Sequence, residues 1–214
     1  MTSSDENNVS LRRGRPSAKE MLLVDERVLS AATALFLELG YGRTTLDMVS
    51  QRAKTGKSAL YNRYQNKESL FNAVVQRSIQ TMFEHMASID MSADRRSRLR
   101  SVGLQLIEGI LHPRCVALMR ITAAEAQNFP ELAKLAYDVS FEGSVRYVVT
   151  ALEGTKLPIG QNVDEIARRF VEVAVQPLSF QAAFGLGPDL LRERSASNVE
   201  DALALLEATG RLTF

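Results

Sequence analysis

A short segment of the chain, residues 57–64, carries side chains of the types that contact nucleic acids. It reads KSALYNRY, and Leu60 and Tyr64, one helical turn apart, predict a buried apolar face. The polar residues are then left facing outward: Lys57, Ser58, Tyr61 and Asn62. An ammonium group binds phosphate oxygens, and ammonium or amide groups can form hydrogen bonds with base edges. The segment therefore predicts a helix whose exposed side contacts DNA.

A second short helix is predicted directly before this one, over residues 44–53. Thr44 can cap it, with Asp47 three residues later as the reciprocal acid. Its apolar face consists of residues at helical spacing: Leu46, Val49 and Ala53. The turn between the two helices contains Gly56, which can adopt backbone conformations that other residues resist. Two helices joined by a short turn with glycine form a helix-turn-helix, whose second helix can enter the major groove.

Positive charge is concentrated around this helix pair. Residues 43–67 contain six cations and one acid, Asp47, although the formal net charge of the whole chain is only +1. The cations are Arg43, Arg52, Lys54, Lys57, Arg63 and Lys67. A local basic patch is typical of a phosphate-binding surface. We therefore expect Thr44, Thr45 and Lys67 to contact phosphates beside the second helix.

A basic run, RRGRP at residues 12–16, precedes the helix pair and supplies Arg12, Arg13 and Arg15. Basic arms of other helix-turn-helix proteins reach phosphates or the adjacent minor groove. A tail that only improves solubility is the alternative interpretation. The position of the run next to a helix-turn-helix favours the DNA-binding arm.

The region of about residues 24–75 contains a set of short motifs: Gly40-Tyr41, Thr44-Thr45, Gly56-Lys57-Ser58-Ala59-Leu60-Tyr61, Tyr64 and Asn66-Lys67-Glu68-Ser69-Leu70. Together they resemble the DNA-binding domain of the TetR family of bacterial transcriptional regulators. That family usually has Ala-Gly-Val-Ser before the recognition helix, where this chain has Ala53-Lys54-Thr55-Gly56. Residues 120–133, RITAAEAQNFPELA, are similar to the C-terminal domains of AefR-like members of the family.

The resemblance implies a repressor that binds a palindromic DNA operator as a homodimer. It also implies that a small hydrophobic effector binds in the C-terminal part and releases the DNA by shifting the helix that begins at Asn66. Dimer contacts are expected on the apolar faces of residues 163–184 and 198–208. Completion of the core of a single subunit is the alternative role for these faces.

Helical periodicity continues through the rest of the chain and predicts an all-α fold. Beyond a first helix that begins at Ser17 or Asp25 and ends at Gly40, helices are expected over about residues 66–89, 95–111, 115–129, 131–153, 163–184 with a kink at Pro177, and 198–208. We divide the chain into a flexible basic arm (1–22), a helix-turn-helix domain (23–72) and a helical effector-binding and dimerisation domain (73–214).

Composition narrows the class of protein further. The 214 residues are 45% hydrophobic, which is enough to bury a core. A single cysteine cannot form an internal disulfide, and this fits a reducing cytoplasm. The sequence shows no signal-peptide pattern and no uninterrupted apolar segment of transmembrane length. We therefore expect a cytoplasmic protein without a membrane partner.

The sequence contains no recognisable catalytic constellation. Gly56-Lys57-Ser58 resembles the end of a P-loop, but Gln51 stands where that motif needs another glycine. His85 and His112 have no neighbours at metal-ligand spacing, so we expect neither a metal nor a cofactor. Cys115 is more often a small buried apolar group than a redox sensor. The rival hypothesis is a helical small-molecule carrier or enzyme that keeps the helix-turn-helix as a scaffold.

An effector cavity is expected among the central helices, because methionine and phenylalanine fill irregular spaces and a few polar groups can orient a ligand. Ordinary core packing is the alternative for each of these side chains. The predicted lining consists of Phe83, Met86, Leu104, Ile107, Leu111, Met119, Thr122, Glu125, Phe129, Tyr137, Phe141, Phe170 and Phe180.

Overall fold

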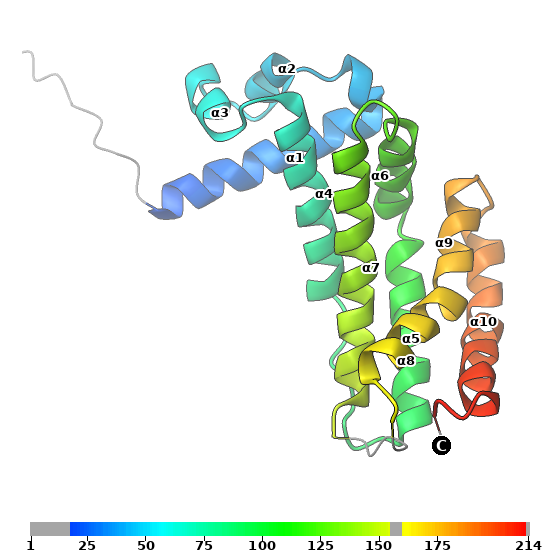
Figure 1. Ribbon diagram of the computed structural model, residues 1–214. Helices are drawn as coiled ribbons and strands as arrows, with labels where there is room; N and C mark the ends of the chain where they lie inside the picture. Colours follow the sequence, from blue (N-terminus) through cyan, green and yellow to red (C-terminus); the bar gives the residue numbers. More distant parts are fainter. Residues whose placement is uncertain (1–17, 155–159, 213–214) are drawn as a thin grey trace, which may run out of the picture.

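The computed structural model describes residues 18–154 and 160–212, which form two groups of helices along an elongated molecule (Figure 1). The helices in these residues are α1 (Ala18–Arg43), α2 (Leu46–Arg52), α3 (Lys57–Arg63), α4 (Lys67–Glu84), α5 (Arg95–Ile110), α6 (Pro113–Ala124), α7 (Pro130–Leu152), α8 (Val163–Ala174), α9 (Gln176–Ala183) and α10 (Pro188–Ala208). The described residues contain no β-strand, so the predicted all-α class is confirmed. Arg12, Arg13 and Arg15 lie outside the described residues.

The smaller group packs α1, α2 and α3 against the first half of α4. Its core includes Phe36, Tyr41 and Phe71, with the Phe71 ring edge-on to the other two at centroid distances of 4.8 and 5.3 Å. Gly40 interrupts α1 with φ 79° and ψ 172°, a combination that residues with a Cβ rarely adopt. The predicted break at Gly40 is confirmed. The helix is already formed at Ala18, so the alternative start at Asp25 is wrong.

The helix-turn-helix is present as α2 and α3, with two local corrections. The N-cap of α2 is Thr45, whose Oγ1 accepts a hydrogen bond from the Met48 N–H at 3.2 Å, and the predicted cap at Thr44 is wrong. Thr44 is buried, and its hydroxyl group is directed to the carbonyl oxygens of Leu35 and Gly40 in α1. The residue with positive φ in the turn is Lys54, at 51°, and Gly56 is the N-cap of α3 with φ −70°.

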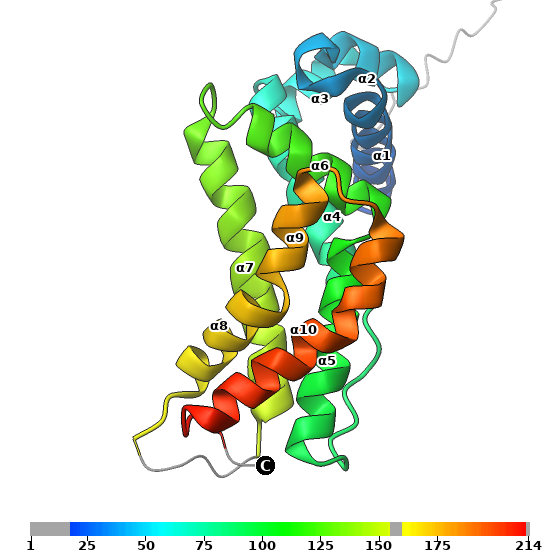
Figure 2. The same cartoon turned by 90° about the vertical axis from the view of Figure 1, so that its right-hand side faces the viewer.

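The larger group is a bundle in which α5, α7, α8 and α10 pack around one apolar core (Figure 2). The predicted kink at Pro177 is a complete break, because α8 ends at Ala174 and α9 begins at Gln176. The predicted start of the last helix at residue 198 is wrong. That helix begins at Pro188, where the missing N–H of proline at the first helical position costs no hydrogen bond. α4 and α6 also end earlier than predicted, at Glu84 and Ala124.

The two apolar cores do not divide at the predicted domain boundary between residues 72 and 73. That position lies inside α4, and Leu118 of α6 and Leu132 of α7 pack in the core of the smaller group. The three-part division of the chain therefore stays a prediction.

Among the described residues, no single helix has the length and apolar character to cross a membrane. The pair α5 and α6 meets that criterion of length and composition only when taken together, and it is bent by 66°.

Candidate DNA-binding surface and ligand cavity

The recognition helix α3 turns its polar side outward. Lys57, Ser58, Tyr61 and Asn62 are all exposed. Leu60 and Tyr64 anchor the opposite side, with only 2% and 7% of their surface exposed. The predicted orientation of the helix is confirmed, and the DNA contacts of these four residues stay a prediction.

A polar contact between distant parts of the chain fixes the angle of α3. Asp25 of α1 forms an ion pair with Arg63, and the Arg63 Nε lies 2.5 Å from the Asp25 Oδ1. The Tyr64 hydroxyl group donates a hydrogen bond to the same carboxylate at 2.6 Å. Burial, with this hydrogen bond adding to its effect, raises the pKa of Tyr64 to about 12. Sequence reasoning missed the role of Asp25, because nothing local links it to α3.

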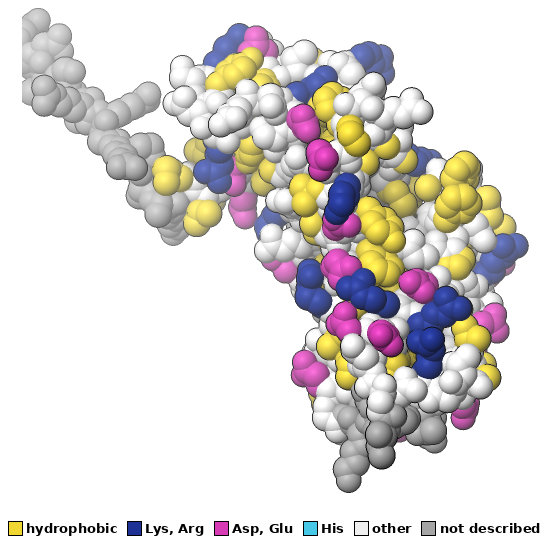
Figure 3. All heavy atoms as spheres, in the orientation of Figure 1, with side chains coloured by type: hydrophobic (Ala, Val, Ile, Leu, Met, Phe, Trp, Pro, Cys, Tyr) yellow, Lys and Arg dark blue, Asp and Glu magenta, His cyan; other side chains and the backbone are white. Residues whose placement is uncertain are grey.

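The basic patch is less positive in space than along the sequence. Arg52 pairs with Glu38 and Lys57 pairs with Asp47, at 2.7 and 2.6 Å. Glu38 and Asp25 both lie outside residues 43–67, so the count of one acid in that segment overstated the charge. Figure 3 shows acidic side chains beside basic ones over the end of the molecule that carries α2 and α3. Arg43 and Lys54 have no carboxylate partner within the described ranges.

The three supporting residues differ in their availability to DNA. Thr45 is exposed, and its hydroxyl hydrogen can still be donated because the cap uses only the oxygen as an acceptor. Thr44 is 1% exposed and donates to carbonyl oxygens of α1, so its predicted phosphate contact is wrong for this conformation. The Lys67 ammonium group donates to the carbonyl oxygens of Tyr41 and Gly42, at 2.9 and 3.1 Å. A phosphate would therefore compete with α1 for Lys67.

A cavity of about 420 Å³ lies between α4, α6, α7 and α9, and its lining includes residues of both apolar cores. Five of the predicted residues line it: Met119, Thr122, Tyr137, Phe141 and Phe180. Figure 3 shows hydrophobic side chains gathered over the middle of α7 and the upper end of α9, at the surface near this cavity. Tyr137 and Phe180 are 56% and 65% exposed, so the cavity opens to the outside between these two helices.

The other predicted residues do not line the cavity: Phe83, Met86, Leu104, Ile107, Leu111, Glu125, Phe129 and Phe170. Several fill spaces beside helical glycines. A Cβ on Gly143 would lie 2.5 Å from the Phe83 ring, one on Gly103 would lie 2.9 Å from the Phe170 ring, and one on Gly109 would lie 3.3 Å from Met86.

The remaining misses also have structural roles. The rings of Phe129 and Tyr41 pack with centroids 5.0 Å apart. Glu125 is the C-cap of α6 and accepts a hydrogen bond from Asn128. Leu104, Ile107 and Leu111 pack in the core.

Sequence reasoning missed eight lining residues on α4 and around α9: Val75, Ser78, Ile79, Met82, Gln176, Ser179, Ala183 and Phe184. Cys115 also lines the cavity, and burial raises the pKa of its thiol, with Arg114 acting in the opposite direction. A protonated thiol is a poor nucleophile, which favours a packing role for Cys115. Across the described chain, no group of three His, Cys, Asp or Glu side chains is placed to hold a metal ion.

One side chain connects the cavity wall with the smaller group. Arg114, at the start of α6, donates hydrogen bonds from Nη2 to the hydroxyl groups of Ser78 and Thr33, at 3.2 and 3.4 Å. Ser78 lines the cavity on α4, and Thr33 lies on α1. The three helices therefore meet at Arg114, next to the site where a ligand would bind.

An exposed recognition helix and an apolar cavity, joined by α4, are the parts of a DNA-binding regulator that responds to a ligand. Residues 28–74 match the family model of bacterial regulatory proteins, tetR family. Residues 97–209 match that of the AefR-like transcriptional repressor, C-terminal domain. The chain belongs to the TetR family of bacterial transcriptional regulators, with an AefR-like C-terminal domain.

Similar proteins agree with this membership. The transcriptional activator FasR of Mycolicibacterium smegmatis is 31% identical over 119 residues, which are 51% of this chain and 54% of FasR. The chain thus spans about half the length of such curated relatives. The solved structure of the flavonoid-responsive regulator FrrA has 28% identity and a TM-score of 0.71, covering 86% of this chain and 96% of FrrA. A TetR-family structure from Mesorhizobium loti has 21% identity and a TM-score of 0.72, covering 85% of this chain and 96% of that chain.

Proposed function

We propose that this protein is a ligand-responsive transcriptional regulator that binds a palindromic operator as a homodimer in the cytoplasm. It acts as a repressor and leaves the DNA when a small hydrophobic effector enters the cavity. The AefR-like C-terminal domain supports repression, since the matching model describes a repressor. The family consists of transcriptional regulators, and a carrier or enzyme is not favoured.

The course of α4 carries the proposal. Its first half supplies Leu70, Phe71 and Val74 to the core that positions α3. Its second half supplies Ser78 and Met82 to the cavity wall. A ligand that displaces the second half must therefore also displace the base of the helix-turn-helix. Such a ligand lowers DNA affinity only if it binds the DNA-incompetent arrangement more tightly.

A homodimer is part of the proposal because two half-sites of a palindrome require two recognition helices. The strongly apolar faces of α8 and α10 are buried within one subunit, for example at Phe170 and Leu203. The predicted dimer contact over residues 163–184 and 198–208 therefore loses these buried positions, whereas Phe180 and Phe184, which also belong to the first range, are exposed. Leu186 and Leu190 are 37% and 44% exposed around the start of α10, and we place the contact there.

The experiment is a protection assay on the DNA upstream of the protein's own gene, followed by binding of the protected palindrome. Replacing both Lys57 and Tyr61 with alanine should abolish protection, because both side chains are exposed on α3. The matched control is the replacement of Lys134, an exposed lysine on α7, with alanine.

The control should protect the same bases as the unchanged protein. Unchanged protection by the double variant would show that α3 does not contact the operator. DNA binding that is insensitive to salt, or absent, would favour the carrier. A monomer in light scattering at micromolar concentration would contradict the dimer.

A further inference from the structure

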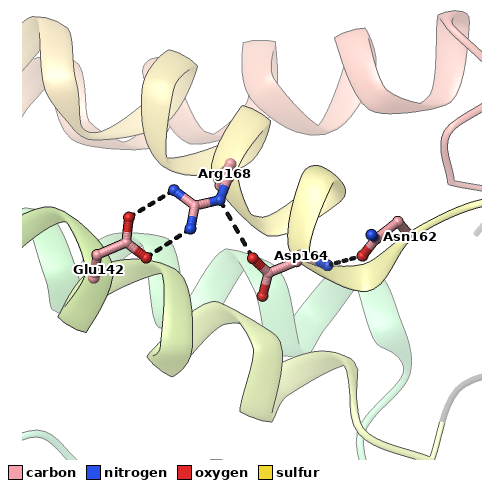
Figure 4. Close-up of polar contacts among 4 residues, drawn as sticks. All are labelled: Glu142, Asn162, Asp164 and Arg168. Atoms are coloured by element: carbon pink, nitrogen blue, oxygen red, sulfur yellow. Dashed lines mark hydrogen bonds and ion pairs between the residues drawn. The ribbon is translucent and has the colours of Figure 1, made fainter.

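Two adjoining helices of the larger group are held by different neighbours. α8 is fixed to α7 by Arg168, whose guanidinium group forms two hydrogen bonds with the Glu142 carboxylate, each 2.7 Å long (Figure 4). Asp164, one turn earlier, also binds Arg168, and Asn162 caps the helix by accepting a hydrogen bond from the Asp164 N–H. α8 therefore lies along α7.

The break at Pro177 sends the next helix elsewhere. α9 packs on α6, where Arg120 donates hydrogen bonds to the carbonyl oxygens of Ala182 and Ala183, at 2.7 and 3.1 Å. Because α8 packs on α7 and α9 packs on α6, α9 moves away from α7 after the break at Pro177. The cavity occupies the resulting space.

Each of the diverging helices presents a pair of aromatic rings to this space. Tyr137 and Phe141 of α7 are stacked at a centroid distance of 5.5 Å, with ring planes 6° apart. Phe180 and Phe184 of α9 lie 4.6 Å apart. Phe184 is 74% exposed, so large apolar surface remains uncovered at the mouth of the cavity. Aromatic pairs favour flat partners, because offset-stacked and edge-to-face contacts need planar rings.

Among the described residues, the lining contains no Asp, Glu, Lys, Arg or His. Its polar groups are hydroxyl groups, one amide and the Cys115 thiol. Thr122 already donates to the Leu118 carbonyl oxygen, so it can offer a ligand only an acceptor. The side chains of Ser140 and Gln176 have no hydrogen-bond partner in the part of the chain that the structure describes, and they can serve a hydroxyl or a carbonyl group.

A charged ligand is disfavoured for two reasons. A cation would lie near Arg114, whose guanidinium group donates to Ser78 directly behind the wall. An anion would lose its hydration and gain no direct contact with a cation, because Arg114 lies behind the wall with its Nη2 already bonded to Ser78 and Thr33 and the described lining residues carry no positive charge. The Cys115 thiol in the same wall shows the same balance. Burial raises its pKa more than the adjacent Arg114 lowers it, so the cost of desolvating a negative charge there exceeds the attraction of the arginine.

We propose that the effector is an uncharged, planar aromatic compound bearing hydroxyl or carbonyl groups, and that its ring lies between the Tyr137–Phe141 and Phe180–Phe184 pairs. This inference rests on the proposed function and specifies its ligand. The name of FrrA describes that protein as flavonoid-responsive, which is one chemical class with these properties.

The test is direct binding of matched compounds to the full-length protein by calorimetry at neutral pH. The compounds are 2-naphthol, the anion 2-naphthoate, the cation 2-naphthylmethylammonium and the saturated alcohol decahydro-2-naphthol. We expect 2-naphthol to bind about tenfold more tightly than each of the others. The two ions pay an uncompensated cost of desolvation, and the saturated alcohol lacks the aromatic ring contacts. Equal or tighter binding of any of the three overturns the proposal.

A pair of variants locates the site. Ser140→Lys places a cation in the lining, and we expect it to weaken 2-naphthol and to strengthen 2-naphthoate, reversing their order. Ser101→Lys makes the same change on an exposed part of α5, and it should leave the order unchanged. Thermal unfolding of both variants checks that they fold. If folded Ser140→Lys keeps the original order, the ring does not lie in this cavity.

Operator binding separates this inference from the function that it assumes. If 2-naphthol binds selectively but operator affinity does not change, the ligand class holds and ligand-controlled release fails. If the charged or saturated compounds bind best and release the operator, release holds and the ligand class fails.

Discussion

Lys54, and not Gly56, holds the left-handed backbone conformation in the turn between α2 and α3. Its φ is 51°, whereas Gly56 has φ −70° two residues later. The usual Ala-Gly-Val-Ser of the family corresponds to Ala53-Lys54-Thr55-Gly56 here, so Lys54 occupies the position of the usual glycine. The left-handed position of this turn is therefore held by a residue with a Cβ, which has to bear the strain.

Lys54→Gly should stabilise the protein. Relief of the left-handed strain, about 1–2 kcal/mol, is partly offset by the larger backbone entropy of glycine in the unfolded chain, so we expect a net gain of about 0.5–1 kcal/mol. Urea unfolding measures it. Lys54→Ala is the control, since it removes the charge and keeps a Cβ. A gain as large in the alanine variant would mean that charge, and not backbone strain, sets the effect.

Gly143→Ala should destabilise the protein although alanine is the better helix former. The new Cβ would lie 2.5 Å from the Phe83 ring, and overpacking of this kind costs about 1–3 kcal/mol against a gain of about 1 kcal/mol in helix propensity. Gly42→Ala is the matched control, because no described atom other than those of its chain neighbours and the adjacent backbone of α1 lies within 4 Å of the Cβ that alanine would add there. Similar unfolding midpoints for the two variants would contradict the close packing of α4 on α7.

Asp47→Asn should strengthen binding to DNA of any sequence. The Asp47 carboxylate holds the Lys57 ammonium group at 2.6 Å and competes with phosphate for it. With asparagine in its place, the variant should have higher affinity at low salt and lose that advantage as salt rises. Fluorescence anisotropy on operator and scrambled duplexes measures both. A gain confined to the operator would indicate that Lys57 reads bases instead.

The Tyr64–Asp25 contact predicts a loss of stability in alkali. The pKa of Tyr64 is raised to about 12, above its unfolded value of 10.0, so the folded state keeps this proton longer than the unfolded state. The stabilisation is complete below the unfolded pKa and is lost as pH rises through the folded pKa. Tyr64→Phe should flatten the fall in unfolding free energy between these two values. A fall of unchanged steepness in the variant would assign the effect to other groups.

The sequence was sufficient for features set by local pattern. The outward side of α3 followed from Leu60 and Tyr64, and the N-terminus of α4 followed from Asn66, which caps it as expected. The start of α10 at Pro188 was missed, because Gly185, Gly187 and Pro188 together have the composition of a turn.

The lining of the cavity could be predicted only in part. Whether a phenylalanine fills space or borders it depends on how closely two helices approach. Gly103 and Gly143 set that distance by admitting Phe170 and Phe83. An isolated glycine in a helical pattern was the available signal, and it does not name the side chain that will fill the space. The Asp25–Arg63 ion pair joins α1 to α3 and left no local signal at all.

In the mechanism that we propose, ligand binding in the cavity changes the DNA affinity of α3 through α4. The most direct measurement is the affinity of the full-length protein for its own upstream palindrome, by fluorescence anisotropy with and without saturating 2-naphthol, alongside a scrambled duplex. We predict tight, salt-dependent binding to the palindrome, weaker by about tenfold or more with 2-naphthol bound. Equal affinity for palindrome and scrambled DNA, or operator affinity unchanged by bound 2-naphthol, would contradict it.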